Sequence, residues 1–416
     1  MIKRFAKAVC RLLARRFVKK LQERRMHAPA LNNSLAVTLV NSWNRPCGIA
    51  TYSEFLAQEL QKTTKLYVTA VPTKNALSPT FETLGYSVGR INDLVHVQFE
   101  YGIFPSLKIG KRTLTAFSAL PFYYGLSLGN RRIVTTVHEP RKIITAGGKS
   151  GLLYTKLLDK LIFNVSDLII VHTEESKRLM QTLYGVEGSK LRVIPHGSYQ
   201  QPKFMDKNRA KAELGLTGKT VVTVLGFVTA KKGHDLVIPL LPKMDRNVQL
   251  VIAGGPQNVE DKRYLEKLEK MAEQHHCIDK VTFTGYLPDL TAILNATDIA
   301  VLPYRTVTDS GVLHLLIAYR VPTVASDLEA FKECYDEYGC LDLFRSGDSQ
   351  NLYEKIQALL SDEKRQDLLK AKCEDMWNAT KWSNIAEKHL EAYRALFLND
   401  TSKQNRDRVY NGNIST

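Results

Sequence analysis

Short apolar runs rich in β-branched residues alternate with helix-period segments along most of the chain, starting at Leu35. The runs have the length of buried strands, and the segments between them repeat apolar residues every three or four positions. Such alternation is typical of a parallel sheet that carries helices on both faces, so an α/β fold is predicted. The expected strands fall in two series, 35–40, 66–71, 94–99, 132–138, 167–173 and 191–197, then 220–227, 248–255, 280–286, 298–304 and 321–327.

A charged stretch over 198–219 separates the two series and is the natural linker. At 416 residues the chain is also too long for one ordinary core. We therefore expect two Rossmann-like β/α/β domains that face a central cleft. The expected boundaries are 32–198 for the first domain, 219–375 for the second, 382–398 for an amphipathic helix that crosses back to the first domain, and 399–416 for a polar, disordered tail.

The N-terminal segment has a pattern of its own. Apolar residues recur at three- and four-residue steps from Ile2 to Leu21, which places them on one face of a helix. Residues 1–28 also hold ten Lys and Arg against Glu23 alone, so the segment 1–31 is expected to form a basic amphipathic helix on an anionic membrane surface. A solvated helix packed on its own domain and an organelle transit peptide fit the same pattern. Nucleic acid is the least favoured partner, because no aromatic stacking platform accompanies the charge.

Composition restricts where in the cell the protein is expected and which metal sites it is expected to hold. No apolar run reaches the roughly 18–20 residues of a membrane-spanning helix, and the N-terminus lacks the uninterrupted apolar segment of a secretory signal. The six cysteines are scattered, without a C-x-x-C pair or the Cys/His spacing of a zinc site. We expect a cytoplasmic protein that associates peripherally with the cytoplasmic face of the membrane.

In open parallel sheets, ligands bind beyond the carboxyl ends of the strands, so the residues just after each strand are the candidate site. After the first strand, a turn ending at Gly48 precedes a helix, and Thr51 with Glu54 has capping-box spacing. Gly48 would let the backbone approach a ligand, and the helix N-terminus favours a phosphate or a sugar hydroxyl, although a purely structural turn looks the same. His138 follows the fourth strand, a place that fits a structural histidine and a cleft residue equally.

The second half carries two further motifs. Lys231 and Lys232 lie beyond Gly226 in the loop after the first strand of this half, before an expected helix. Basic residues there suit a diphosphate, and the simpler interpretation is a solvated loop. Asp-Ser-Gly-Val at 309–312 forms a turn that opens a helix, which presents its backbone N–H groups and positive end to an anion. The expected buried face of that helix is Leu313, Leu316 and Ile317.

Taken in order, these motifs resemble those of the retaining glycosyltransferases of GT-B fold, family four, over about residues 35–398. The resemblance implies that His138 contacts the transferred sugar, that Lys232 binds the diphosphate, and that Asp309 replaces the first of two family glutamates. The donor-binding residues that it implies are Gly48, Gly226, Lys231, Gly285, Tyr286, Leu287, Ser310, Gly311 and Val312, with His196 of the Ile-Pro-His-Gly turn and His314 as further candidates.

Four positions depart from the family pattern. Phe227 stands where the family commonly has an arginine, Val307 and Leu315 stand where it has two glutamates, and Arg320 replaces a glycine. The Ser-Gly-Val sequence at 310–312 resembles one branch of the family, in which backbone amides and a hydroxyl take over the phosphate contacts.

The implied activity is transfer of a sugar from a nucleotide-diphosphate sugar to a glycan or lipid-linked acceptor, with retention, in cell-surface polysaccharide or glycolipid synthesis. No Asp-x-Asp occurs in the chain, so no metal is expected. A basic and aromatic stretch over 107–132 is expected to border the acceptor side, unless its aromatic residues belong to the core. The alternatives are a catalytically silent sugar- or lipid-binding homologue and a nucleotide-sugar epimerase or dinucleotide-dependent oxidoreductase. The oxidoreductase is disfavoured because no G-x-G-x-x-G follows the first strand.

Overall fold

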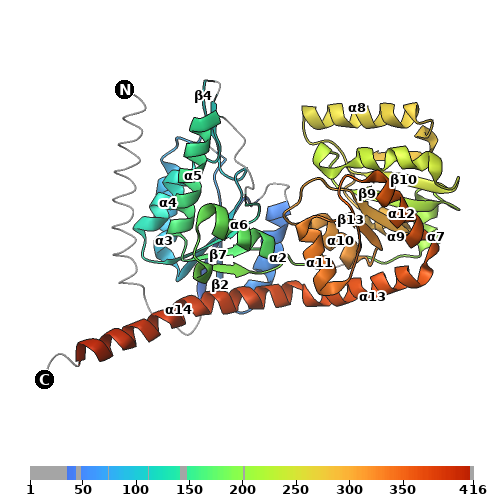
Figure 1. Ribbon diagram of the computed structural model, residues 1–416. Coiled ribbons are helices and arrows are strands. Elements are labelled where there is room, and N and C mark those ends of the chain that lie inside the picture. Colours follow the sequence, from blue (N-terminus) through green and yellow to red (C-terminus); the bar gives the residue numbers. More distant parts are fainter. Residues whose placement is uncertain are drawn as a thin grey trace. The chain divides into compact units, whose positions relative to one another are not determined.

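The computed structural model describes residues 35–43, 48–73, 75–110, 112–140, 148–199 and 202–412. The chain divides into two compact units (Figure 1). Unit 1 runs to Pro195 and takes in the chain again from Trp382 onward, and unit 2 is His196–Lys381. The basic helix expected over 1–31 and the turn residues 44–47 lie outside the described residues.

Unit 1 is built on a six-stranded parallel sheet in the order β2-β1-β3-β6-β7-β8. Every residue of β3, β6 and β7 is buried, as expected for parallel strands with both faces covered. The elements are β1 (Ala36–Asn41), α2 (Gly48–Leu60), β2 (Lys65–Ala70), α3 (Thr80–Ile91), β3 (Leu94–Phe99), β4 (Leu107–Ile109), β5 (Arg112–Leu114), α4 (Ala119–Leu128), β6 (Arg132–Val137), α5 (Gly148–Val165), β7 (Leu168–Val171), α6 (Glu174–Tyr184), a 3-10 turn η1 (Gly188–Lys190), β8 (Leu191–Val193) and α14 (Trp382–Gly412).

Unit 2 repeats this architecture with the sheet order β11-β10-β9-β12-β13-β14, again parallel throughout. The predicted α/β class with two Rossmann-like sheets is therefore confirmed, although β14 and the β4–β5 hairpin were not foreseen. The elements are α7 (Lys207–Glu213), β9 (Thr220–Leu225), the 3-10 turns η2 (Ala230–Lys232), η3 (His234–Leu236) and η4 (Ile238–Lys243), β10 (Val248–Ala253), α8 (Val259–Gln274), a further 3-10 turn η5 (Ile278–Lys280), β11 (Val281–Gly285), α9 (Thr291–Ala296), β12 (Ile299–Leu302), α10 (Gly311–Ala318), β13 (Thr323–Ser326), α11 (Glu329–Tyr338), β14 (Asp342–Phe344), α12 (Ser349–Ser361) and α13 (Glu363–Ala379).

Helices α3 and α4 pack so closely that only glycine fits at their contact. A Cβ at Gly85 would lie 2.1 Å from the carbonyl oxygen of Phe122, and one at Gly125 would lie 2.2 Å from that of Glu82. The same packing buries Phe122 and Tyr123 completely. The expectation that these aromatic side chains border the acceptor side was therefore wrong, because apolar rings gain more from the core than from an exposed loop.

Helix α14 begins at Trp382, whose ring packs on α2 at 4.9 Å from the Tyr52 ring and 5.6 Å from the Phe55 ring. It continues to Gly412, so the tail expected to be disordered from 399 is helical over most of its length (Figure 1). The physical reason is that a helix nucleated by the packed segment extends at low cost through residues that are not proline.

One local expectation in unit 2 was wrong. The loop after β9 leads into three 3-10 turns and not an α-helix, because Pro239 and Pro242 lack the N–H that an α-helix needs. The linker over 198–219 contains α7, whose N-cap Asp206 accepts a hydrogen bond from the Arg209 N–H.

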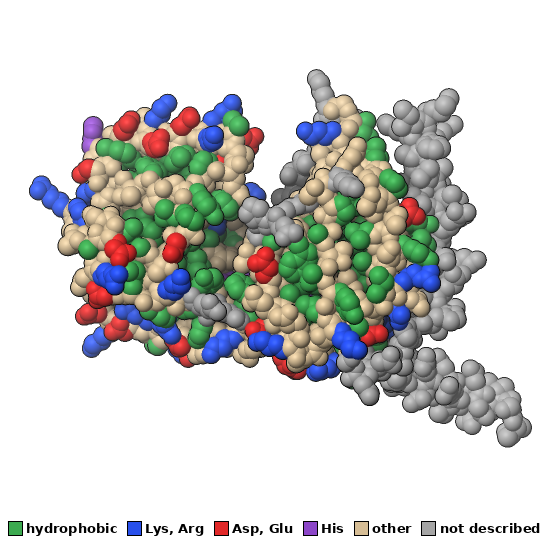
Figure 2. Space-filling model, turned by 180° about the vertical axis from the view of Figure 1, so that it is seen from behind, with side chains coloured by type: hydrophobic (Ala, Val, Ile, Leu, Met, Phe, Trp, Pro, Cys, Tyr) green, Lys and Arg blue, Asp and Glu red, His purple; other side chains and the backbone are tan. Residues whose placement is uncertain are grey.

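None of the helices among the described residues is long and apolar enough to cross a membrane. Figure 2 shows acidic and basic side chains interspersed over the visible face of unit 2. The cation-rich segment of the sequence is 1–28, outside the described residues.

Candidate functional site

In unit 2 the strand order reverses between β9 and β12, and ligands of open α/β sheets bind beyond the carboxyl ends of the strands at such a switch point. The predicted donor residues follow these two strands. Gly226 comes directly after β9, with φ of +111°. A Cβ at this position would lie 3.1 Å from Cγ2 of Val312 and 3.7 Å from Nζ of Lys232. The fold therefore brings together Gly226, Lys232 and Val312, which three separate motifs contribute.

Lys232 is the half-buried cation of this group. Its Nζ lies 3.7 Å from the centroid of the Tyr304 ring and donates a hydrogen bond to the Tyr304 hydroxyl. Burial lowers the pKa of Lys232 to about 7, because few polar groups replace the water that its charge has lost. Sequence reasoning missed Tyr304, although its place just after β12 was a signal. The neighbouring Lys231 is exposed.

Arg305 fixes the loop that carries both lysines. Its backbone N–H donates to the Lys231 carbonyl at 2.8 Å, and its Nη1 donates to the Ala230 carbonyl at 2.8 Å. The guanidinium also forms a forked pair with the Asp235 carboxylate, at 2.9 and 2.8 Å, and this pair lowers the pKa of Asp235 against the opposing effect of burial. The paired loop therefore holds Lys232 in a defined position.

The predicted start of α10 is confirmed, with Ser310 as its N-cap. The Ser310 Oγ accepts the Leu313 N–H at 3.2 Å, and Asp309 Oδ1 accepts the Ser310 N–H at 2.7 Å. A Cβ at Gly311 would meet no atom within 4 Å, so this helix end is open. The expected buried face is also confirmed, since Leu313, Leu316 and Ile317 are buried.

His196 and His314, the further candidates, lie beside Asp309. Their rings stack with centroids 4.9 Å apart and planes 23° apart. His314 is 5% exposed, and its Nε2 lies 3.3 Å from Asp309 Oδ1. Sequence reasoning named these three residues separately and did not foresee that they form one group.

His138 follows β6 in unit 1 and is half-buried. Its Nε2 lies 2.8 Å from Gln98 Oε1, its Nδ1 lies 3.2 Å from His172 Nε2, and the Tyr52 ring contacts it edge-on with centroids 4.9 Å apart. Gln98 and His172 were missed, although they lie at the carboxyl ends of β3 and β7, the strands on either side of β6. Three neighbouring strands thus orient one imidazole.

A second layer of buried polar groups supports Gln98. Its Nε2 lies 3.2 Å from Nε2 of His96, and the other nitrogen of His96 lies 2.6 Å from the Tyr393 hydroxyl on α14. Burial lowers the pKa of His96 well below its usual value and that of His389, also on α14, to about 4. Both rings are therefore neutral near pH 7.

The remaining donor candidates are more open. Gly48 begins α2, three residues before the expected capping-box start at Thr51, and a Cβ on Gly48 would meet no atom within 4 Å. Gly285 has φ of +67° at the end of β11. Tyr286 is 73% exposed, and Leu287 packs partly on the core.

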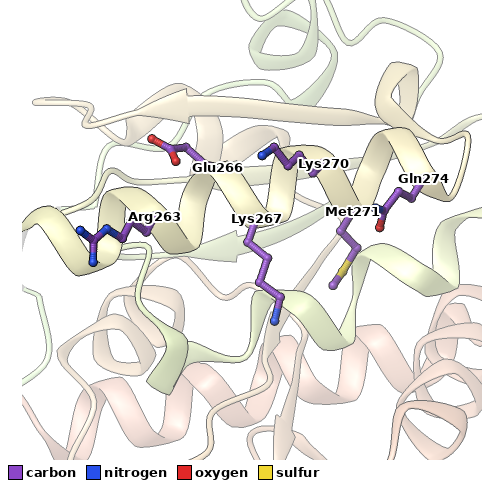
Figure 3. Close-up of a pocket in the computed structure, with 6 residues that line it drawn as sticks. All are labelled: Arg263, Glu266, Lys267, Lys270, Met271 and Gln274. Carbon is purple, nitrogen blue, oxygen red and sulfur yellow. The ribbon is translucent and has the colours of Figure 1, made fainter.

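A surface hollow beside α8 is not part of this group (Figure 3). Its lining residues all belong to α8. Met271 is half-buried, and the exposed ones are charged or polar: Arg263, Glu266, Lys267, Lys270 and Gln274. None of them is a predicted site residue. A one-sided, charged lining of this kind does not resemble a ligand pocket, which is concave and mostly apolar.

Comparison with known proteins agrees with this architecture. Residues 92–198 match the family model described as Glycosyltransferase Family 4, and residues 206–375 match that described as Glycosyl transferases group 1. The two matches together place the chain among the group 1 glycosyltransferases of GT-B fold.

Individual relatives are distant. The chain is 24% identical over 246 residues to D-inositol 3-phosphate glycosyltransferase of Nocardia farcinica, covering 57% of the chain and 54% of that protein. It is 28% identical over 214 residues to the GDP-mannose-dependent alpha-(1-6)-phosphatidylinositol monomannoside mannosyltransferase of Mycolicibacterium smegmatis, covering 47% and 52%. The alignments thus span about half of each relative. Among solved structures, Anabaena Alr3699/HepE in complex with UDP has a TM-score of 0.71 at 14% identity, covering 87% of the chain and all of that protein.

One departure from the family pattern has a structural consequence. Arg320, at the place of the usual glycine, has φ of +55°, a left-handed conformation that favours glycine. Its guanidinium pairs with Glu374 and lies 4.6 Å from the centroid of the Phe204 ring. These contacts offset the backbone strain of a non-glycine residue there.

Proposed function

We propose that the protein is a glycosyltransferase that binds a nucleotide-diphosphate sugar in unit 2 and transfers its sugar to an acceptor. The observation that carries the proposal is the convergence of Gly226, Lys232 and the open end of α10 at the switch point of the sheet. A half-buried lysine and a helix N-terminus both favour a diphosphate. The family matches support this assignment, as do the UDP and UDP-glucose complexes of the structural neighbour HepE.

The proposed reaction retains the anomeric configuration. The acceptor hydroxyl attacks the anomeric carbon on the face from which the diphosphate leaves, and a departing phosphate oxygen takes the hydroxyl proton. Lys232 and the α10 N-terminus stabilise the charge that develops on the leaving diphosphate, so neither a protein nucleophile nor a metal is required. His138 would contact the transferred sugar, held in place by Gln98 and His172.

The proposal is tested with the purified chain, a panel of nucleotide sugars and detection of released nucleoside diphosphate. At least one donor should be consumed only when an acceptor is present, and turnover should continue in excess EDTA. An anomeric assignment of the product by NMR tests retention. Release from no donor, with all acceptors tried, would contradict the activity, and loss of turnover in EDTA would contradict the metal-independent mechanism alone.

A catalytically silent sugar-binding homologue is the second candidate, and the two missing glutamates favour it. Val307 and Leu315 both pack partly on the apolar core of unit 2, so neither can replace a carboxylate. Donor binding by calorimetry without release of nucleoside diphosphate would favour this candidate over an enzyme.

The acceptor is proposed to be a glycan or a lipid-linked sugar at the cytoplasmic membrane face, in polysaccharide or glycolipid synthesis. Two observations support it: the basic, amphipathic sequence over 1–31, and a relative whose name specifies phosphatidylinositol monomannoside. Cosedimentation with vesicles of varied anionic content should show salt-sensitive binding by the full chain, because exposed charges are screened within about 8 Å at physiological ionic strength. A chain starting at Asn32 should bind less. Equal, negligible binding by both would favour a soluble acceptor.

A further inference from the structure

His196, Asp309 and His314 form a group of metal-ligand type in unit 2. One ligand atom of each lies within 4.8 Å of the others. His314 Nε2 and Asp309 Oδ1 are 3.3 Å apart. A tetrahedral ion with bonds of about 2.0–2.1 Å holds its ligand atoms about 3.3–3.4 Å apart, so this pair already has the required spacing.

The hydrogen bonds behind His314 determine which of its nitrogens carries a proton. The Met376 carbonyl can only accept, so the Thr380 hydroxyl donates to it, at 2.8 Å. Thr380 Oγ1 then accepts the Ser198 hydroxyl proton at 2.7 Å, and Ser198 Oγ is left to accept from His314 Nδ1 at 3.4 Å. The neutral ring therefore has its proton on Nδ1 and a lone pair on Nε2.

That lone pair faces a carboxylate oxygen. Asp309 Oδ1 and a neutral His314 Nε2 are both acceptors, and two acceptors 3.3 Å apart repel each other unless positive charge lies between them. Either a second proton on His314 or a bound cation supplies that charge.

His196, like His314, forms a hydrogen bond through its Nδ1 to an acceptor outside the group. Its Nδ1 lies 2.7 Å from the Gly197 carbonyl oxygen, which can only accept, so Nδ1 carries the proton and Nε2 is the basic nitrogen. A second nitrogen bonded to a carbonyl or hydroxyl is what metal-ligating histidines usually show, because it fixes the tautomer and the ring orientation.

We propose that His196, Asp309 and His314 bind a divalent transition-metal ion such as zinc. Two imidazole nitrogens and one carboxylate oxygen suit zinc, cobalt or nickel, and suit magnesium poorly. Only the fourth position would be left for water or another ligand.

The site goes beyond the proposed transfer, which uses Lys232 at the diphosphate and no metal. Metal binding is measured without donor or acceptor, so its outcome does not depend on whether the chain transfers a sugar.

Cobalt is the probe, because tetrahedral cobalt absorbs visible light. The chelator-treated full chain should take up one cobalt ion and show this absorption, zinc should displace it, and excess magnesium should not. His196→Ala and Asp309→Asn should each weaken cobalt binding by more than about a hundredfold, and Ser198→Ala by about 10–100-fold, as for other outer partners of ligating histidines. His275→Ala, at an exposed position after α8, is the matched control and should bind like the wild type.

Asp309→Asn also distinguishes the loss of a metal ligand from unfolding of the protein. Its amide oxygen can still accept the Ser310 N–H, as the carboxylate oxygen does, so this variant should keep its thermal stability while losing the metal. Absence of cobalt uptake by the wild type, uptake that these variants leave unchanged, or NMR evidence that a proton on His314 alone supplies the charge would overturn the proposal.

Discussion

His138 in unit 1 and Lys232 in unit 2 both follow a strand near the middle of a parallel sheet, yet their surroundings differ in charge. The network behind His138 consists of neutral groups, because burial holds His96 and His389 uncharged. The group around Lys232 contains ionisable side chains, with a lysine whose pKa of about 7 lies near physiological pH. The buried polar groups of unit 1 therefore orient the His138 side chain, whereas the group in unit 2 positions a positive charge on Lys232.

Lys232→Ala is expected to have the largest effect on this difference between the two units, because it removes the cation of unit 2. A charge-assisted phosphate contact contributes about 1.5–3 kcal/mol, so turnover should fall about ten- to a hundredfold. Steady-state kinetics with the accepted donor measures it. Lys243→Ala, at an exposed position on η4, is the matched control and should behave like the wild type. Unchanged kinetics in a folded Lys232→Ala protein would contradict the site.

Gly125→Ala tests the rigidity of unit 1. The added Cβ would lie 2.2 Å from the Glu82 carbonyl oxygen, so α3 and α4 must separate. We expect a loss of about 1–3 kcal/mol of stability, as for other overpacked sites, measured by denaturant unfolding. Gly48→Ala adds a Cβ to open space and should leave stability nearly unchanged. Equal stability of the two variants would show that the close helix contact is not a constraint.

Gln98→Leu tests whether His138 is oriented by its neighbours. The change removes the 2.8 Å contact with His138 Nε2, and kcat should fall roughly tenfold, the value of about one hydrogen bond, while the donor KM changes little. Gln249→Leu removes a comparable buried amide from β10 and is the control. A parallel loss of activity in both variants would indicate general destabilisation instead.

The pH dependence of donor affinity tests whether Lys232 binds the diphosphate in its charged form. Burial sets its pKa at about 7 in the empty protein, so the side chain is charged below pH 7 and increasingly neutral above it. A diphosphate binds the charged form, so affinity should be flat below pH 7 and fall by up to about tenfold per unit above it, until the raised pKa of the complex is reached. Calorimetric titration from pH 6 to 9 measures this, and Lys232→Arg should flatten the profile.

Arg320→Gly should have the smallest effect. Glycine relieves a left-handed φ, by about 1 kcal/mol, but loses the Glu374 pair and the Phe204 contact, which contribute about as much. Arg320→Ala loses the same contacts and keeps the strain, so it should be the less stable of the two by about 1 kcal/mol in thermal unfolding. Equal stability of the two variants would contradict a strained backbone at this position.

Several candidate residues could be predicted because each follows a strand. Gly226, Lys232 and Ser310 were found from local signals: a turn glycine, a basic loop and a helix cap. Gln98, His172 and Tyr304 were missed. The place of such a residue at the carboxyl end of a strand signals that it lies near the site, but no local feature distinguishes a supporting side chain from a functional one. The two prolines after β9 were visible in the sequence and already disfavoured the α-helix that was expected there.

The sequence by itself determined the α/β class, the two sheets and most strand positions, because hydrophobic periodicity is a local property and burial in a parallel sheet requires it. Only the tertiary structure decided which polar groups meet. Ser198 and Thr380 are 182 positions apart in the sequence and share a hydrogen bond. His196 and His314 are also far apart in the sequence of unit 2, and their rings stack. Such pairs depend on the order in which strands assemble into the sheet, and no local pattern of residues encodes that order.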